Sequence, residues 1–223
     1  MSQAARQITG KFLNILKIGH PRLVQVAKEV ADVKASHIQS AIKQMLYTFK
    51  HSPEFESRLG VAANQFDLEL PINQTPKIFL ARLPKLSPHP RYDEIWKQNQ
   101  ITIPLSVIVN PKITPTTDEK ILAVEPCASL PKIKAAVLRW KSINCTYWDE
   151  NGEVKSLDLD GLGSILFQHE RDHLDGILAS HVAEYIVNEE TGELIPDYNP
   201  QEIEFVEYIM GNADFNPDFF IGS

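Results

Sequence analysis

The residues best suited to chemistry lie together in the last third of the sequence. His169-Glu170-Arg171-Asp172-His173 fits the pattern H-E-x-x-H, in which two histidines one helical turn apart can chelate a divalent metal. The glutamate beside them can accept and return protons. The alternative is two buried imidazoles satisfied by hydrogen bonds alone. Two histidines on one helical face, with Glu170 between them, favour the metal site.

A catalytic metal needs a third protein ligand, and the sequence offers three candidates. One metalloprotease group would have a histidine at position 179, but this chain has Ala179, so that assignment fails. A second group uses a glutamate about twenty residues after the second histidine. Glu193 stands there, within a turn-like segment. The third candidate is Cys127, whose thiolate suits iron, zinc or nickel better than magnesium or calcium.

A helix is predicted to carry the two histidines. Asp160 can cap its start, and Gly176 can end it. The apolar residues before the motif are Leu162, Ile165 and Leu166. Their helical stripe continues onto His169 and His173. Both imidazoles are therefore expected to face the protein interior, where a metal ion would be held.

Other segments predict a second helix and several strands. A helix is expected at 36–50, opening with Ser36 and Gln39 as a capping box. Short strands are expected at 77–81, 105–110 and 121–124. A hairpin with an Asn-Gly turn is expected across 143–159. The elements therefore predict an α+β protein.

Two segments are predicted to lie outside the core. Residues 82–104 contain four prolines and little periodicity, which predicts a surface insertion. Beyond a last helix expected at 200–211, residues 212–223 predict a loose tail.

Composition limits the classes of protein and partner. The 223 residues carry 22 Lys and Arg against 29 Asp and Glu, which gives a net charge of −7. An acidic balance argues against nucleic acid or an anionic membrane as the main partner. No apolar run reaches the ~18 residues of a membrane helix. With two cysteines and no secretion signal, we expect one domain over 1–223 in the cytoplasm, with Cys145 as a buried hydrophobic residue.

Three separated blocks resemble the signature of the peptide deformylase family. The family patterns are G-x-G-x-A-A-x-Q, E-G-C-x-S and Q-H-E-x-D-H. The matching segments here are Arg58-Leu59-Gly60-Val61-Ala62-Ala63-Asn64-Gln65, Glu125-Pro126-Cys127-Ala128-Ser129 and Gln168-His169-Glu170-Arg171-Asp172-His173. The likeness extends from about residue 15 to about residue 182. It implies an α+β fold with antiparallel strands around a central helix that carries the H-E-x-x-H motif.

The resemblance implies a hydrolase that removes the N-formyl group from formyl-methionine at the N-terminus of nascent polypeptides, releasing formate. It implies one divalent metal ion, ferrous iron first, with zinc, nickel or cobalt as other occupants. The implied ligands are Cys127, His169 and His173. Glu170 would transfer the proton, and the Ala128 N–H and the Gln65 side chain would stabilise the oxyanion. The expected partner is a formyl-methionyl peptide or nascent chain near the ribosome, bound by a monomer.

Three residues depart from the family pattern and alter the expected substrate groove. Arg58 replaces the first glycine of block one, Pro126 replaces the glycine before the cysteine, and Ala128 replaces the usual leucine. None of them changes a predicted metal ligand. The residues expected to bind substrate are Gly60, Arg58, Leu162 and Ile165.

Two competing functions follow from the same residues. One is a metal-binding paralogue with weak or no deformylase activity that binds peptide termini. The other is a thiol amidase with Cys127 as its nucleophile, although the sequence offers no third residue to orient such a pair. A chelator separates the thiol amidase from a metal-dependent hydrolase, because a cysteine nucleophile should survive loss of metal.

Overall fold

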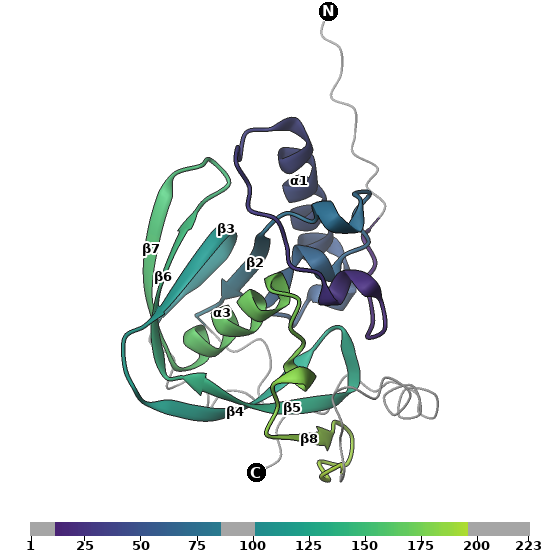
Figure 1. Cartoon of the computed structure of the whole chain (residues 1–223), viewed down its shortest axis with the longest axis vertical. Helices are drawn as coiled ribbons and strands as arrows, with labels where there is room; N and C mark the ends of the chain where they lie inside the picture. Colours follow the sequence, from purple (N-terminus) through teal and green to yellow (C-terminus); the bar gives the residue numbers. More distant parts are fainter. Residues whose placement is uncertain (1–11, 86–100, 196–223) are drawn as a thin grey trace, which may run out of the picture.

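The computed structural model describes residues 12–85 and 101–195. Within them the fold is α+β, as the sequence predicts. Two α-helices, α1 (Ser36–His51) and α3 (Gly161–Leu174), accompany two antiparallel sheets. In Figure 1, α3 lies between the strands of the larger sheet and those of the smaller one. The helix α1 packs on the opposite face of the larger sheet from α3.

The larger sheet has five strands in the order β1-β2-β3-β6-β7, and the smaller has three in the order β4-β5-β8. The strands of the larger sheet are β1 (Gly60–Ala62), β2 (Ile78–Leu83), β3 (Ile103–Pro115), β6 (Ser142–Trp148) and β7 (Val154–Asp160). Those of the smaller sheet are β4 (Lys120–Cys127), β5 (Leu130–Trp140) and β8 (Tyr185–Asn188). Because α3 contacts β1, β2 and β7 on one side and β5 on the other, residues of both sheets can converge on it.

The strand β2 is apolar on both faces because it contributes to two core clusters. Alternate side chains of a strand point to opposite faces. Ile78 and Leu80 accordingly join the cluster under α1, whereas Phe79 and Ala81 join the cluster around α3. Phe79 meets Phe167 of α3 edge to face, with ring centroids 5.2 Å apart. The helix that carries the histidines is thus packed directly on the central sheet.

Most of the predicted elements are confirmed. The strands expected at 77–81, 105–110 and 121–124 correspond to β2, β3 and β4. The β6–β7 hairpin turns at Asn151 and Gly152, and Gly152 has a φ of +79°. Strands β1, β5 and β8 were not predicted from the sequence. Each is placed by pairing with a partner strand and lacks a clear local signal of its own.

The helix ends agree with the prediction in one case and correct it in the other. Asp160 caps α3, and its carboxylate accepts a hydrogen bond of 2.7 Å from the Gly161 N–H. The capping box predicted for α1 is wrong, because Ala35 is the N-cap and makes no side-chain cap bond. The Gln39 amide instead donates to the carbonyls of Val33 and Glu150. It therefore joins α1 to the β6–β7 turn.

Part of the predicted insertion is strand. Residues 82–83 belong to β2 and residues 103–104 to β3, while 86–100 lie outside the described residues. The helix predicted at 200–211 and the tail at 212–223 also lie outside them. Among the helices of the described ranges, none combines the length and apolarity needed to cross a membrane.

Gly176 ends α3, and we expect its replacement by alanine to be costly. Its φ is +73°, and an added Cβ would lie 2.7 Å from the Val24 carbonyl oxygen. Gly192 has nearly the same φ, +72°, with no atom within 4 Å of such a Cβ. Gly176→Ala should therefore lower the free energy of unfolding by about 2–4 kcal/mol, and Gly192→Ala by about 1 kcal/mol. Urea denaturation measures both, and equal losses would show that the Val24 contact does not matter.

Candidate metal centre and active site

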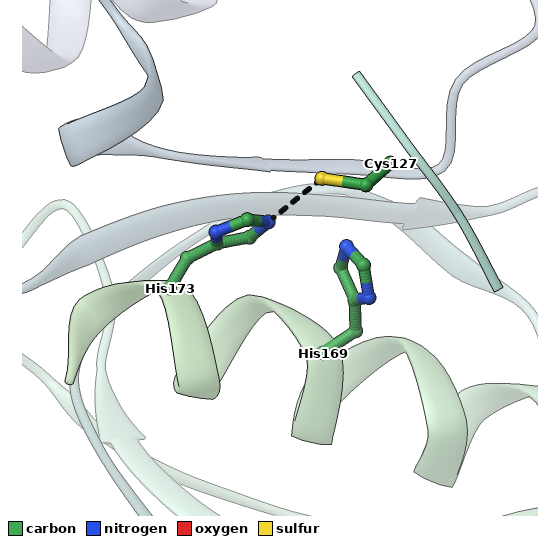
Figure 2. A group of neighbouring side chains, drawn as sticks. All are labelled: Cys127, His169 and His173. Atoms are coloured by element: carbon green, nitrogen blue, oxygen red, sulfur yellow. Dashed lines mark hydrogen bonds between the residues drawn. The ribbon is translucent and has the colours of Figure 1, made fainter. Parts of the chain in front are cut away.

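Cys127, His169 and His173 lie together although 46 residues separate the first from the last. Their candidate ligand atoms all lie within 4.8 Å of one another. Cys127 Sγ is 3.2 Å from His173 Nε2, and the two imidazole rings are 4.9 Å apart at 82°. Figure 2 shows the thiol of Cys127 facing both rings of α3. The structure therefore brings together the three residues predicted as metal ligands.

The end of β4 places Cys127 against the helix. The register between β4 and β5 shifts between Pro126 and Cys127, and β4 is an edge strand. A proline is tolerated there because an edge strand can lack a ladder donor. Ala128 and Ser129 then form a two-residue turn, because Cys127 pairs with Leu130. The proline that departs from the family pattern is thus compatible with the strand that presents the thiol.

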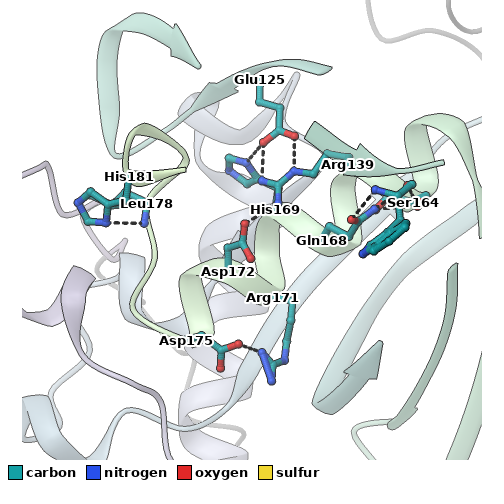
Figure 3. A network of polar contacts seen from close by, with 11 residues as sticks. Glu125, Arg139, Ser164, Gln168, His169, Arg171, Asp172, Asp175, Leu178 and His181 are labelled. Atoms are coloured by element: carbon teal, nitrogen blue, oxygen red, sulfur yellow. Dashed lines mark hydrogen bonds and ion pairs between the residues drawn. The ribbon is translucent and has the colours of Figure 1, made fainter. Parts of the chain in front are cut away.

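A buried network orients His169. Its Nδ1 is 2.8 Å from a Glu125 carboxylate oxygen, so its Nε2 faces Cys127. Arg139 donates from Nε and Nη2 to the two Glu125 oxygens, at 2.6 and 2.8 Å, and from Nη1 to Asp172 (Figure 3). A carboxylate behind a ligand histidine fixes its tautomer and raises its basicity.

Sequence reasoning did not assign roles to Glu125 and Arg139. Glu125 could have been found, because it stands two residues before Cys127 and alternate strand residues share a face. Arg139 carries no such signal, because its contacts with Glu125 and Asp172 join residues that are 14 and 33 positions apart in the sequence. Gln168 belongs to the third sequence block and was not predicted to have a role of its own. Its amide accepts from the N–H of Trp140 and donates to the carbonyl of Trp140, which links α3 to the end of β5.

Charges in the cluster favour the ionised thiolate. Burial opposes ionisation of Cys127, but His173 and His169 hold the pKa of its thiol well below the usual range. Burial likewise opposes charge on His169, but hydrogen bonds to Cys127 and Glu125 raise the pKa of the imidazole well above its usual value. One thiolate and two imidazoles form a donor set that fits Fe²⁺, Zn²⁺ or Ni²⁺. Metal binding there would displace the proton that the raised pKa favours on His169.

Glu170 lies beside this cluster in a nearly closed environment. It is 3% exposed, and its Oε2 has no hydrogen-bond partner among the described residues. Burial raises the pKa of its carboxyl to about 7, with the charge of Cys127 adding to the rise and His169, His173 and Arg58 opposing it. A carboxyl that titrates near neutrality can both accept and donate a proton.

Gly60 is needed for this arrangement. A Cβ added at Gly60 would lie 2.5 Å from Glu170 Oε1. The absence of a side chain there therefore lets the edge strand β1 lie against the carboxyl. The structure places Gly60, predicted to bind substrate, in contact with the predicted proton-transfer residue.

Gln65 and the Ala128 turn flank Cys127. The Gln65 Nε2 is 3.7 Å from Cys127 Sγ and 3.1 Å from Ser129 Oγ. Its Oε1 accepts a 2.8 Å bond from the Ala62 N–H, which fixes the amide with its nitrogen toward the cluster. Ala128 opens the turn after β4, so its N–H is not used by the β4–β5 ladder. The structure brings both predicted oxyanion donors to the candidate ligands, and their roles stay predictions.

Residues 16–18 hold the backbone at these two donors in place. This role was not predicted from the sequence. The Leu16 N–H donates to the Gln65 carbonyl at 2.8 Å, and the Ile18 N–H donates to the Ser129 carbonyl at 2.9 Å. The Lys17 ammonium donates to the Ala128 carbonyl at 3.0 Å. One extended segment thus ties the Gln65 and Ala128 backbones to each other.

Other sequence candidates lie elsewhere. Glu193 is exposed in the turn after β8 and does not belong to the ligand group found among residues 12–85 and 101–195, so that alternative ligand is wrong. Leu162 packs against the core cluster around α3. Ile165 is half-buried and belongs to none of the three core clusters of the described residues.

The two cysteines should differ sharply in reactivity. Cys145 is 0% exposed, and burial raises the pKa of its thiol to about 12, whereas the pKa of Cys127 is lowered. Because the thiolate is the reactive form, iodoacetamide should modify Cys127 and leave Cys145 intact in folded, chelated protein at pH 8. Peptide mass mapping gives the sites. Added zinc should protect Cys127, and prior labelling of Cys145 would contradict the assignment.

A family model described as polypeptide deformylase matches residues 12–188 of this sequence. The chain belongs to the peptide deformylase family. Among its curated relatives, "Peptide deformylase 2" of Xanthomonas axonopodis pv. citri is 32% identical over 75% of this chain and 84% of the relative. "Peptide deformylase 1A, chloroplastic" of Solanum lycopersicum is 29% identical over 74% of this chain. The match spans only 57% of that plant protein.

Solved peptide deformylase structures share the fold. A probable peptide deformylase from Synechococcus phage S-SSM7 is 32% identical over 76% of this chain and 98% of the other, with a TM-score of 0.57. The Synechococcus elongatus enzyme in complex with actinonin is 28% identical over 77% and 80% of the two chains, with a TM-score of 0.58. The deformylase family therefore supplies both the sequence match and the structural match.

Proposed function

We propose that this protein removes the N-formyl group from formyl-methionine at the N-terminus of nascent polypeptides and releases formate. The observation that carries the proposal is the meeting of Cys127, His169 and His173 beside the buried carboxyl of Glu170. This group lies inside the segment that matches the deformylase family. The helix α3, which carries both histidines, would then be the central H-E-x-x-H helix of the active site.

The donor set supports a single divalent metal ion, and we propose ferrous iron, with zinc, nickel or cobalt as other occupants. Cys127 would bind through Sγ, and His169 and His173 through Nε2, the nitrogens that face the thiol. When bound, such a cation supplies a Lewis acid that polarises a carbonyl and lowers the pKa of water. Glu125 holds His169 from behind in the orientation that this binding requires.

The residues around the donor set divide the remaining work. Glu170, whose Oε2 is free of partners among the described side chains, would take a proton from water and deliver it to the leaving amine. The Gln65 amide and the Ala128 N–H would stabilise the negative oxygen that develops on the formyl carbon. One such donor is typically worth about 3 kcal/mol of transition-state stabilisation. Gly60 and Arg58 would line the peptide path, and Ile165 would contact the methionine side chain.

Several features of the setting stay predictions. They are action close to the ribosome, a monomeric state and a cytoplasmic location. The metal-binding paralogue without activity is not favoured, because both proton transfer and oxyanion stabilisation have candidate residues in place. The thiol amidase is also not favoured, because both histidines near Cys127 belong to the candidate metal site.

Formate release from a formyl-methionyl peptide tests the proposal. The protein is loaded with ferrous iron or nickel without oxygen, because ferrous iron and a thiolate ligand are oxidisable. We expect one metal per chain and formate release that stops on chelation. Stoichiometric metal without formate would favour the binding paralogue. Activity that survives chelation would favour the thiol amidase.

A further inference from the structure

Arg58 is a cation near the candidate active site, and its side chain has no ion-pair partner among the described residues. Its Nε is buried and makes no hydrogen bond within residues 12–85 and 101–195. Burying part of a charged group without a partner costs free energy. The family pattern has a glycine at this position, so the guanidinium departs from that pattern. Its outer N–H groups remain available to a ligand.

The carboxyls of Glu170 and Glu189 are both influenced by the charge of this guanidinium. Arg58 stands two residues before Gly60, where an added Cβ would lie 2.5 Å from Glu170 Oε1. Its charge opposes the burial-driven rise in pKa of both Glu170 and Glu189. Glu189 follows β8, and its N–H donates to the Lys132 carbonyl at 2.8 Å. The guanidinium is therefore near the proton-transfer carboxyl on one side and Glu189 on the other.

Glu189 does not neutralise Arg58. The two side chains form no ion pair in the part of the chain that the structure describes. After burial, the largest influence on the Glu189 carboxyl is the charge of Lys134, which lowers its pKa more than Arg58 does. Arg58 keeps its own capacity for an anion.

The backbone that carries Arg58 is held firmly. Arg82 donates from Nε to the Arg58 carbonyl at 2.9 Å and from Nη2 to the Phe55 carbonyl at 2.7 Å. The Arg82 N–H donates to the Leu59 carbonyl at 2.7 Å, and the Arg58 N–H donates to Phe55 at 3.2 Å. The loop is fixed on both sides of Arg58 while its side chain stays unpaired. Because the backbone at Arg58 is already fixed, binding an anion there would require no ordering of the backbone.

We propose that Arg58 binds a carboxylate that lies within two residues after the formyl-methionine of the substrate. This inference rests on the proposed function, in which Glu170 must reach the leaving nitrogen. A cation next to Glu170 then lies beside the first peptide units of the substrate. A guanidinium binds a carboxylate through two parallel hydrogen bonds. The carboxylate can be an acidic side chain or the C-terminus of a short formyl peptide.

Two matched peptide pairs test the inference and separate the sources. The first pair is formyl-Met-Glu-Ala amide against formyl-Met-Gln-Ala amide. The second is formyl-Met-Ala-Ser with a free C-terminus against its amide. We expect about tenfold higher kcat/KM for the acidic member of at least one pair, carried mainly by a lower KM. The pair that shows it identifies the source.

Variants assign the preference to Arg58. In Arg58→Gln the acidic-to-neutral ratio should fall to about one, while Arg58→Lys should retain part of it, because lysine lacks the bidentate fork. Glu189→Gln should increase the ratio, because it removes the nearby negative charge. Lys155→Gln removes an equal charge from a distant surface strand and should leave the ratio as in the unmodified chain.

The outcomes distinguish this inference from the proposed function. Formate from all four peptides without an acidic preference overturns the role of Arg58 and leaves the function standing. An acidic preference that persists in Arg58→Gln overturns it as well. If no peptide yields formate, the function fails. Calorimetry with Met-Glu-Ala amide and Met-Gln-Ala amide then decides the inference without turnover, and equal binding would overturn it.

Discussion

Glu170→Ala is expected to lower kcat for formate release by about 10²–10⁴-fold while one metal ion per chain is still bound. General acid–base catalysis by one positioned group typically contributes that factor. Metal binding should survive because Glu170 is not among the three clustered ligand residues. Formate release under anaerobic conditions and metal analysis of the same sample measure the two properties separately.

The same substitution should not weaken the fold. Burial raises the pKa of the Glu170 carboxyl to about 7, so the folded state binds a proton more tightly than the unfolded state. Above the unfolded pKa this group therefore destabilises the fold, increasingly until the pH passes the folded pKa. Metal-free Glu170→Ala should be at least as stable as the parent chain at pH 8. Glu153→Ala, at an exposed glutamate, is the control for activity.

Two results would contradict the assignment. Activity retained in Glu170→Ala would show that another group transfers the proton. Activity lost together with metal would show that Glu170 acts on the site as a whole. We expect Glu170→Ala to lose turnover while it keeps its metal and its fold. We expect Glu153→Ala to keep its activity.

Local signals predicted most of what lies near the site in sequence. The two ends of α3 were predicted because Asp160 and Gly176 each act locally on one end of the helix. The β6–β7 hairpin was predicted because the Asn151-Gly152 turn specifies it. The Ser36 capping box failed for a non-local reason. The Gln39 side chain, which would complete such a box, instead bonds carbonyls at Val33 and Glu150.

The third metal ligand could not be identified from residue spacing alone. Spacing along the chain left both Cys127 and Glu193 open. The pairing of β4 with β5 and the contact of β5 with α3 bring only Cys127 to the histidines, because Glu193 follows β8 in an exposed turn. Arg139, Asn64 and Lys17 also could not be predicted from the sequence, because their partners lie far away along the chain. Asn64 donates to the His173 carbonyl and Lys17 to the Ala128 carbonyl across more than a hundred residues.

Arg139→Met is expected to lower the free energy of unfolding by about 3–5 kcal/mol at pH 7. Removing one partner of a buried ion pair leaves an uncompensated charge. Arg139 is 5% exposed and Glu125 4% exposed, and the guanidinium also bonds Asp172. Urea denaturation of the metal-free protein measures the loss. The exposed pair Lys141–Glu119 supplies the control, because Lys141→Met should change stability little.

The loss should shrink as the solution becomes acidic. Burial alone would raise the pKa of Glu125, but Arg139 and His169 hold it below its usual value. A carboxyl with a depressed folded pKa stabilises the fold above its unfolded pKa and loses this effect as pH falls. Without Arg139, the pKa of Glu125 should be higher than in the parent chain, because burial then meets less opposition. Glu125 can then accept a proton more readily as the pH falls. The stability difference should therefore narrow as the pH falls toward and below the ordinary glutamate pKa of 4.5. A constant difference would point to packing alone.

A double variant separates the stability of this network from its service to the metal site. Replacing a buried ion pair by apolar residues of similar volume is often neutral or stabilising. Glu125→Leu with Arg139→Met should thus recover much of the stability lost in Arg139→Met. His169 Nδ1 would still lack its carboxylate, so metal affinity should remain about 10–100-fold below that of the parent chain. Recovery of both properties together would mean that Glu125 and Arg139 serve the fold alone and do not orient the ligand histidine.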